Sequence, residues 1–262
     1  MSIMYRYDNP ELYAQDILSS LNLTPPVDVF KVCEAYGLNV NYENISSAEA
    51  LLIVSKGKKN IIINDKKIAY APRQRFSIAH EVGHFFIPWH GSVCTCLHIG
   101  DFSSEDVEEK EADVFASELL IPTEALLYKI CDKVITLELI KELAQEFNVS
   151  LFSMTRKVIA NSGQKVIALL YYSNGNKIVI DKSQSFDFKL KSGIVKGSAA
   201  KELLHNRSCN EIVKKILNSD IWFNELIKEY QIVEESLKQP NFSRVFTLLR
   251  IANDFDYYGR LF

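Results

Sequence analysis

The pattern of apolar and polar residues along the chain predicts two helices at its start. Apolar side chains recur at helical spacing over residues 10–21, and Pro25 and Pro26 prevent that helix from continuing. A second helix is expected to begin at Asp28, a suitable N-cap residue, and to end before Gly37, which favours a helical C-cap.

Strands and a longer helix are predicted next. Residues 38–45 alternate between apolar and polar, and residues 50–64 predict two strands joined by a lysine-rich turn at 56–58. Residues 76–87 then predict a helix with an apolar stripe along one face. We therefore expect this helix to pack on a small antiparallel sheet.

The second half of the chain changes from helical to mixed character. A helix is predicted from about Glu105 to Leu120, and two more over 136–146 and 151–160. Turn-forming residues at 161–164 mark a boundary. Beyond it we expect a hairpin around Asn174-Gly175 and then helices over 198–205, 209–218 and 220–238.

Composition narrows the class of protein. Hydrophobic residues make up 47% of the 262 residues and charged residues 24%, as is usual for a soluble protein. The net charge of −3 argues against nucleic-acid binding by the whole molecule, although a local basic face stays open. The N-terminal stretch lacks the apolar run of a signal peptide, and five cysteines do not suggest a disulfide framework. We therefore expect a cytoplasmic protein.

Two histidines and a glutamate stand inside the predicted helix over 76–87. His80 and His84 are four residues apart, so both imidazoles project from one side of the helix and can reach one Zn²⁺. Glu81 lies about 100° round the axis and reaches the same cleft from the side. The alternative is a charged surface cluster, which the apolar flanking residues disfavour. The spacing is the His-Glu-x-x-His signature of zinc hydrolases, with Glu81 as the general base.

A third ligand has to come from elsewhere in the chain, because a catalytic zinc usually has three protein ligands. Glu109 and Asp113 share one side of the predicted helix over 105–120 with Ala112 and Ala116, whose small size permits close helix packing. Glu109 would then reach the metal, and Asp113 would hold a ligand imidazole by its second nitrogen. The alternative, a solvated acidic helix, stays open on spacing alone, and Glu105, Glu108 and Glu111 are expected to be solvated.

These two blocks together resemble the ImmA/IrrE family of metallo-endopeptidases, also known as domain of unknown function 955. The resemblance covers roughly residues 10–160. In the first block the matching residues are Arg75, Phe76, Ala79, His80, Glu81, Gly83 and His84. In the second block they are Glu109, Ala112, Asp113, Phe115, Ala116, Leu119, Leu120 and Pro122.

The resemblance implies an α+β protein with a zincin-like fold, one Zn²⁺ per chain and Glu109 as the third ligand. It implies an endopeptidase that cleaves a partner helix-turn-helix repressor or antitoxin-like protein and so derepresses phage, mobile-element or stress-response genes. Residues 140–160 resemble the helix-turn-helix region of the family. We therefore expect a metallopeptidase domain over 1–130, a helix-turn-helix-like segment over 131–162 and a mixed α/β domain over 163–262, which would act as a sensor or in substrate docking.

A second set of metal-binding residue types lies between the two blocks: His90, Cys94, Cys96 and His98. Three interpretations are open: an additional metal site, a regulatory thiol that occupies the open zinc position, or a loop with incidental cysteines. The Cys-x-Cys spacing lacks the two-residue spacer of common zinc knuckles, which favours the loop.

Two functions compete with the peptidase. One is a regulatory protein that binds DNA or a partner and has a structural or sensory metal site. The other is a DNA-binding regulator with a vestigial peptidase domain, but residues 140–160 offer only Lys141, Arg156 and Lys157 for phosphate contacts. A purely structural metal site has no use for a general base, so Glu81 favours the enzyme.

Overall fold

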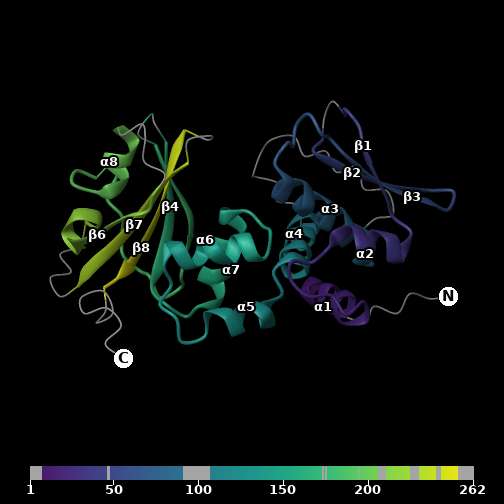
Figure 1. The fold of residues 1–262 in the computed structure, drawn as a ribbon, viewed down its shortest axis with the longest axis horizontal. Coiled ribbons are helices and arrows are strands. Elements are labelled where there is room, and N and C mark those ends of the chain that lie inside the picture. The colour runs from purple at the N-terminus through teal and green to yellow at the C-terminus, as the bar shows by residue number, and fades with distance from the viewer. Residues whose placement is uncertain are drawn as a thin grey trace. The chain divides into compact units, whose positions relative to one another are not determined.

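The computed structural model describes residues 8–45, 48–90, 107–172, 174, 176–193, 195–205, 211–224, 230–239 and 243–252. The chain forms two compact units (Figure 1). Unit 1 comprises residues 1–128 and 144–153, and unit 2 comprises residues 129–143 and 154–262.

The first two helices of unit 1 form as their local sequence predicts. Helix α1 spans Pro10–Ser20, and helix α2 spans Val29–Tyr36. The Asp28 carboxylate accepts a hydrogen bond from the Phe30 N–H, which satisfies a backbone donor that the first turn leaves unpaired. Gly37 has φ 69°, the left-handed conformation that ends a helix most easily without a side chain.

Three strands form the sheet of unit 1, in the order β1-β3-β2. Strand β1 spans Asn39–Tyr42, and the hairpin consists of β2, Ala50–Ser55, and β3, Lys58–Ile63. The hairpin is antiparallel, but β1 pairs with β3 in parallel. The expectation of an antiparallel sheet was therefore wrong for β1, because this strand joins the far edge of the hairpin and periodicity does not encode strand order.

Helices α3 and α4 lie against each other beside this sheet. Helix α3 spans Ala71–Phe86 and packs against β2, β3 and α4, while α4 spans Val107–Leu120 and also packs against α1. Helix α3 begins earlier than expected because Pro72 stands in its first turn, where a missing N–H costs nothing. From Ser77 to His84 every residue of α3 is buried, so this helix is the centre of unit 1.

Three further helices follow α4. Helix α5, Thr123–Ile130, was not predicted and starts directly after Pro122. Helices α6, Leu137–Glu146, and α7, Leu151–Asn161, match the two helices expected there. The turn between α6 and α7 places Asn148 at φ 52°, a conformation that asparagine tolerates better than most residues.

Unit 2 contains a five-stranded sheet in the order β5-β4-β8-β7-β6, with every neighbouring pair antiparallel. The strands are β4, Val166–Tyr172; β5, Lys177–Lys182; β6, Val213–Asn218; β7, Gln231–Gln239; and β8, Arg244–Ile251. Helices α8, Ala199–His205, and α9, Ser219–Trp222, also belong to this unit. The hairpin of β4 and β5 and the helix over 198–205 were expected. The helices expected over 209–218 and 220–238 were wrong, because residues 213–218 form β6 and residues 231–239 form β7, although the short helix α9 overlaps the second range.

Two consecutive glutamates of β7 connect the sheet to helices on its opposite faces. Glu234 accepts a hydrogen bond from the Ala200 N–H of α8 at 2.7 Å, and Glu235 accepts one from the Leu137 N–H of α6 at 2.6 Å. Neighbouring side chains of a strand point to opposite faces. Both carboxylates are buried, so each supplies an acceptor that a helix start would otherwise lack.

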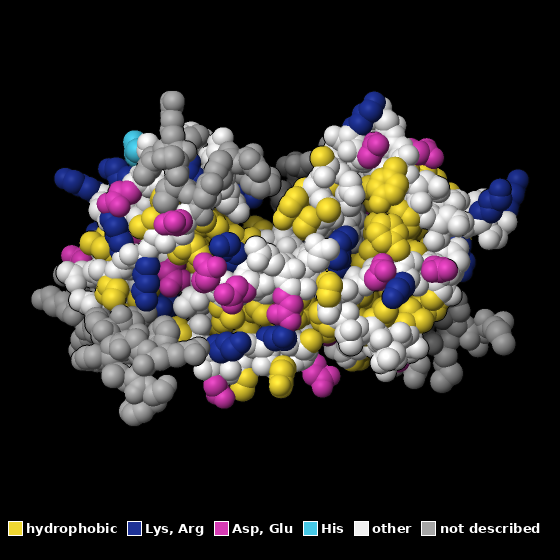
Figure 2. Space-filling model, viewed as in Figure 1, with side chains coloured by type: hydrophobic (Ala, Val, Ile, Leu, Met, Phe, Trp, Pro, Cys, Tyr) yellow, Lys and Arg dark blue, Asp and Glu magenta, His cyan; other side chains and the backbone are white. Residues whose placement is uncertain are grey.

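The surface is mixed in character. On the face drawn in Figure 2, lysine and arginine side chains are interspersed with carboxylates, and apolar side chains lie between them. None of the helices in the described part of the chain is long and apolar enough to span a membrane.

Candidate metal centre

The two histidines of the motif lie side by side on α3, as their spacing requires. His80 is 4% exposed and His84 is 3% exposed. Their Nε2 atoms are 3.1 Å apart and their ring centroids 4.8 Å apart. Both rings therefore direct the same nitrogen toward one point.

Glu109 of α4 faces that point from the neighbouring helix. Its Oε2 lies 3.1 Å from His80 Nε2, and its Oε1 lies 3.4 Å from His84 Nε2. Ligand atoms of a tetrahedral zinc site with bonds of about 2.0–2.1 Å are separated by roughly 3.3 Å. Within the described residues, these three side chains are the set of histidines, cysteines and acids whose ligand atoms gather closely enough to hold one metal ion. The donor set and its spacing fit Zn²⁺.

The close approach of α3 and α4 depends on Gly83. A Cβ at this position would lie 3.0 Å from Cδ1 of Phe115 and 3.3 Å from Cα of Ala112. Ala112 and Ala116 are both fully buried, as the stripe of small residues predicts. The small residues of both helices therefore set the distance over which Glu109 reaches the imidazoles.

The second nitrogen of His80 is held by Asp113. Its Oδ1 lies 2.9 Å from His80 Nδ1, although its side chain is 55% exposed. This is the arrangement expected from the four-residue spacing of Glu109 and Asp113 on one side of α4. An acceptor at Nδ1 keeps a ring proton on that nitrogen, so Nε2 is the nitrogen that would bind an ion.

The second nitrogen of His84 meets a residue whose role the sequence did not indicate. His90 Nδ1 lies 3.0 Å from His84 Nδ1, and His90 Nε2 lies 2.9 Å from Oε2 of Glu111. The same oxygen accepts a hydrogen bond from Trp89 Nε1 at 2.6 Å. The expectation of a solvated Glu111 was therefore wrong, because the segment after α3 brings two donors to it. Cys94, Cys96 and His98, grouped with His90 in the sequence, lie outside the described residues, as does Glu105.

Glu81 stands beside the His80–His84–Glu109 set with a carboxylate that is only 2% exposed. The backbone N–H of Leu52 on β2 hydrogen-bonds this carboxylate. Its Oε2 has no hydrogen-bond partner among the described residues, which is unusual for a buried oxygen. Burial raises the pKa of Glu81 to about 7, although His80 opposes the shift and Glu109 adds to it. Among the described residues this oxygen is thus free to contact a further group, and the pKa of the carboxyl suits proton transfer near neutral pH.

The charges of the ligand set are strongly coupled. Burial alone would lower the pKa of His80, but hydrogen bonds to Asp113 and Glu109 outweigh it and raise the pKa to about 9. Burial would raise the pKa of Glu109, yet its hydrogen bonds with His80 and His84 lower it. The coupling therefore favours a protonated His80 beside an ionised Glu109.

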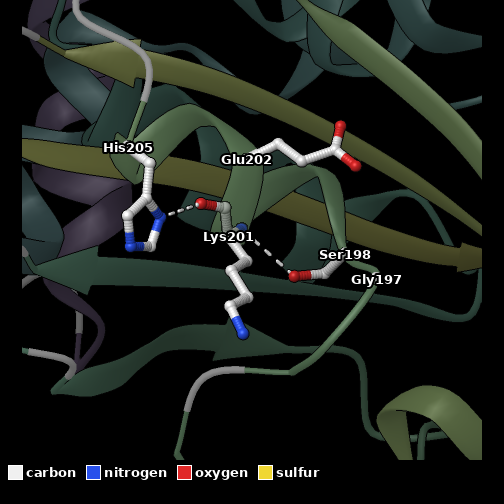
Figure 3. Close-up of a pocket in the computed structure, with 5 residues that line it drawn as sticks. All are labelled: Gly197, Ser198, Lys201, Glu202 and His205. Carbon is white, nitrogen blue, oxygen red and sulfur yellow. Dashed lines mark hydrogen bonds between the residues drawn. The ribbon is translucent and has the colours of Figure 1, made fainter.

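A pocket in unit 2 offers no comparable chemistry. It is lined by Gly197, Ser198, Lys201, Glu202 and His205 (Figure 3). His205 Nδ1 lies 2.8 Å from the Lys201 carbonyl oxygen, and the Lys201 N–H donates to Ser198 Oγ. These polar groups thus hydrogen-bond to helix α8 and its first turn.

The basic side chains of residues 140–160 are also engaged within the protein. Lys141 pairs with Glu138 at 3.2 Å, Arg156 lies 3.9 Å from Asp181, and Lys157 is buried at 8% exposure. Phosphate contacts need cationic groups directed to solvent. Of these three side chains Lys157 is removed from solvent, whereas those of Lys141 and Arg156 are 39% and 61% exposed.

Comparisons with known proteins relate the region around this site to one family. Residues 33–158 match the family model Peptidase_M78, described as the IrrE N-terminal-like domain. The resemblance to the ImmA/IrrE family is thereby confirmed over just under half of the chain, which suggests a metallopeptidase of this type. A search among curated proteins found no match.

One solved structure similar to this chain is described as a Mycobacterium tuberculosis transcriptional regulator. The similarity has a TM-score of 0.56 at 11% sequence identity, and it covers 96% of this chain and 78% of that chain. At this identity the likeness concerns the fold alone.

Proposed function

We propose that this chain, whose residues 33–158 match the IrrE N-terminal-like domain, is a zinc-dependent endopeptidase. His80, His84 and Glu109 would hold the ion, with Asp113 orienting His80. The observation that carries the proposal is the buried Oε2 of Glu81, which has no partner among the described residues and stands next to the three ligands. A structural metal site would gain nothing from such a carboxylate, whereas hydrolysis needs a base there.

The residues divide the chemistry between them. A bound Zn²⁺ would supply Lewis-acid polarisation of the scissile carbonyl and of the attacking water. Glu81 Oε2 would accept a proton from that water and then deliver it to the nitrogen of the departing amine. The Leu52 N–H holds the carboxylate in place, and the pKa of about 7 lets it both take and return the proton. Helices α3 and α4 supply the ligands from rigid, packed elements.

The substrate we propose is a helix-turn-helix repressor or antitoxin-like protein, whose cleavage would switch on phage, mobile-element or stress-response genes in the cytoplasm. The support for this class is the resemblance of the sequence to the ImmA/IrrE family. We assign the peptidase to residues 1–130, a substrate-docking role to the helix pair within 131–162, and a sensor or docking role to residues 163–262.

Co-expression with a helix-turn-helix protein encoded beside this one tests the activity. The wild type is expected to convert that protein into two fragments, and Glu81→Gln is expected to leave it intact while binding the same amount of zinc. Cleavage by both forms, or by neither, would favour the rival function, a metal-containing regulator that binds without cutting. Glu124→Gln serves as the matched control, because Glu124 is exposed on α5.

A further inference from the structure

We propose that His90 and Glu111 form a positioning pair for His84, which fixes the tautomer and orientation of this metal ligand. The inference rests on the proposed metal centre and adds to it two residues that take no part in binding the ion. It also gives His90 a role separate from the cysteines that follow it in the sequence.

Two successive contacts connect Glu111 of α4 to His84 through His90. Oε2 of Glu111 lies 2.9 Å from His90 Nε2, and His90 Nδ1 lies 3.0 Å from His84 Nδ1. The other nitrogen of His84, Nε2, faces His80 and Glu109. His90 therefore touches His84 on the side opposite the proposed ion and does not compete for a coordination position.

Only one arrangement of protons satisfies every contact when His84 Nε2 binds a cation. That nitrogen must then be without a proton, so the proton of His84 is on Nδ1 and is donated to His90. His90 must accept at its Nδ1, which places its own proton on Nε2, where it is donated to Glu111. An ionised carboxylate can only accept hydrogen bonds, so Glu111 ends this series of hydrogen bonds with every donor facing an acceptor.

The burial of both imidazole rings makes the loss of these hydrogen bonds costly. The side chains of His84 and His90 are both 0% exposed, so an unpaired N–H on either ring could not turn to water. Oε2 of Glu111 also accepts from Trp89 Nε1, and the Trp89 ring contacts Tyr13 of α1 edge-on at a centroid distance of 6.1 Å. The Glu111 carboxylate is therefore held by hydrogen bonds to both Trp89 and His90.

The pair complements Asp113 on the other histidine. Asp113 holds His80 through a carboxylate that is 55% exposed, whereas His84 is held through a buried imidazole backed by a carboxylate 24% exposed. Outer partners of metal-bound histidines typically contribute about 10- to 100-fold to metal affinity. We expect His90 to contribute within this range.

The test compares zinc affinity of the full chain by competition with a chromophoric chelator. His90→Phe retains a ring of similar size but has no acceptor, and it is expected to weaken zinc binding about 10- to 100-fold. His90→Asn places an acceptor oxygen the same number of bonds from Cβ as Nδ1 of the histidine. This variant is expected to recover most of the zinc affinity. His205→Phe is the control, because His205 is an exposed histidine of unit 2.

The outcomes separate this inference from the proposed function. Zinc binding by the wild type with unchanged affinity in His90→Phe would overturn the positioning pair and leave the metal centre standing. A wild type that binds no zinc would overturn the metal centre itself, and the positioning pair with it. With Co²⁺ in place of zinc, the visible absorption bands should change in His90→Phe and return toward the wild-type spectrum in His90→Asn.

A second measurement needs no variant and decides the case if His90→Phe does not fold. Nitrogen NMR of the zinc-loaded wild type reports which nitrogen of each histidine carries a proton. The expected result is a proton on Nδ1 of His84 and on Nε2 of His90. A proton on Nδ1 of His90 would overturn the proposal, because that nitrogen could not then accept from His84.

Discussion

Asp113 Oδ1 lies 2.9 Å from Nδ1 of His80, on the opposite side of the ring from the nitrogen that faces Glu109. Since Asp113 and Glu109 are four residues apart on α4, one helix holds the imidazole from both ends. The ring can therefore neither flip nor change its tautomer without breaking a contact to α4.

Removing this contact should weaken metal binding without removing a ligand. In Asp113→Ala we expect zinc affinity to fall by about tenfold, the lower end of the usual range for such partners, because the carboxylate is 55% exposed and solvent screens it. Competition with a chelating dye measures the change. An affinity equal to that of the exposed control Glu124→Ala would show that the contact does not orient His80.

Gly83→Ala should move α3 and α4 apart, although alanine is more favourable than glycine inside a helix by about 1 kcal/mol. The added methyl would meet the Phe115 ring at 3.0 Å and the Ala112 backbone at 3.3 Å, and the backbone contact cannot be relieved by a rotamer change. We expect lower zinc affinity, since Glu109 moves away from the imidazoles, and a lower melting temperature. Phe115→Leu in the same chain should restore part of both, because it removes the ring. A variant with wild-type zinc affinity would contradict the packing argument.

Zinc binding should release a proton and strengthen as the pH rises. The pKa of His80 is about 9 in the absence of metal, so below pH 9 its proton must leave before Nε2 can bind an ion. Affinity should therefore rise up to about tenfold per pH unit below pH 9 and level off above it. In Asp113→Ala, which lacks a hydrogen bond that raises this pKa, the plateau should begin at lower pH. Calorimetry in buffers of different ionisation enthalpy counts the protons, and an affinity independent of pH between 7 and 8.5 would contradict the assignment.

The features that depend on neighbouring residues could be predicted from the sequence. Asp28 and Gly37 end α2 as expected because caps act over three or four residues. His80 and His84 face one point because helical geometry fixes the four-residue spacing. The position of Glu109 could not be predicted from spacing alone, since the small residues Ala112 and Ala116 permit a close approach of two helices but do not specify which helix packs against α4.

The features that depend on distant contacts could not be predicted. The buried glutamates Glu234 and Glu235 suggest a solvated helix until the backbone donors of α8 and α6 are known to meet them. Strand β6 alternates between half-buried and exposed residues at the edge of its sheet, but its sequence VKKILN does not alternate between apolar and polar residues. The contact of Glu111 with His90 depends on the path of the chain after α3, which no local pattern specifies.

Glu234→Ala should destabilise unit 2 and leave the metal centre unchanged. The buried carboxylate accepts hydrogen bonds from the Ala200 N–H, Trp222 Nε1 and Ser236 Oγ. Leaving buried donors without an acceptor costs about 1–3 kcal/mol each. We expect a loss of roughly 3 kcal/mol in urea unfolding, against less than about 1 kcal/mol for the exposed control Glu138→Ala. Zinc affinity should be retained because every proposed ligand belongs to unit 1, and a parallel loss of zinc would contradict that independence.

The zinc content of the full chain, compared between the wild type and Glu109→Gln after gel filtration in metal-free buffer, tests the central claim most directly. Glutamine keeps the size of the side chain but removes the charge that His80 and His84 face at 3.1 Å and 3.4 Å. We expect the wild type to retain about one zinc ion per chain, and Glu109→Gln to retain well below that. Equal zinc content in the two proteins would show that Glu109 is not a ligand and would contradict the metal centre described above.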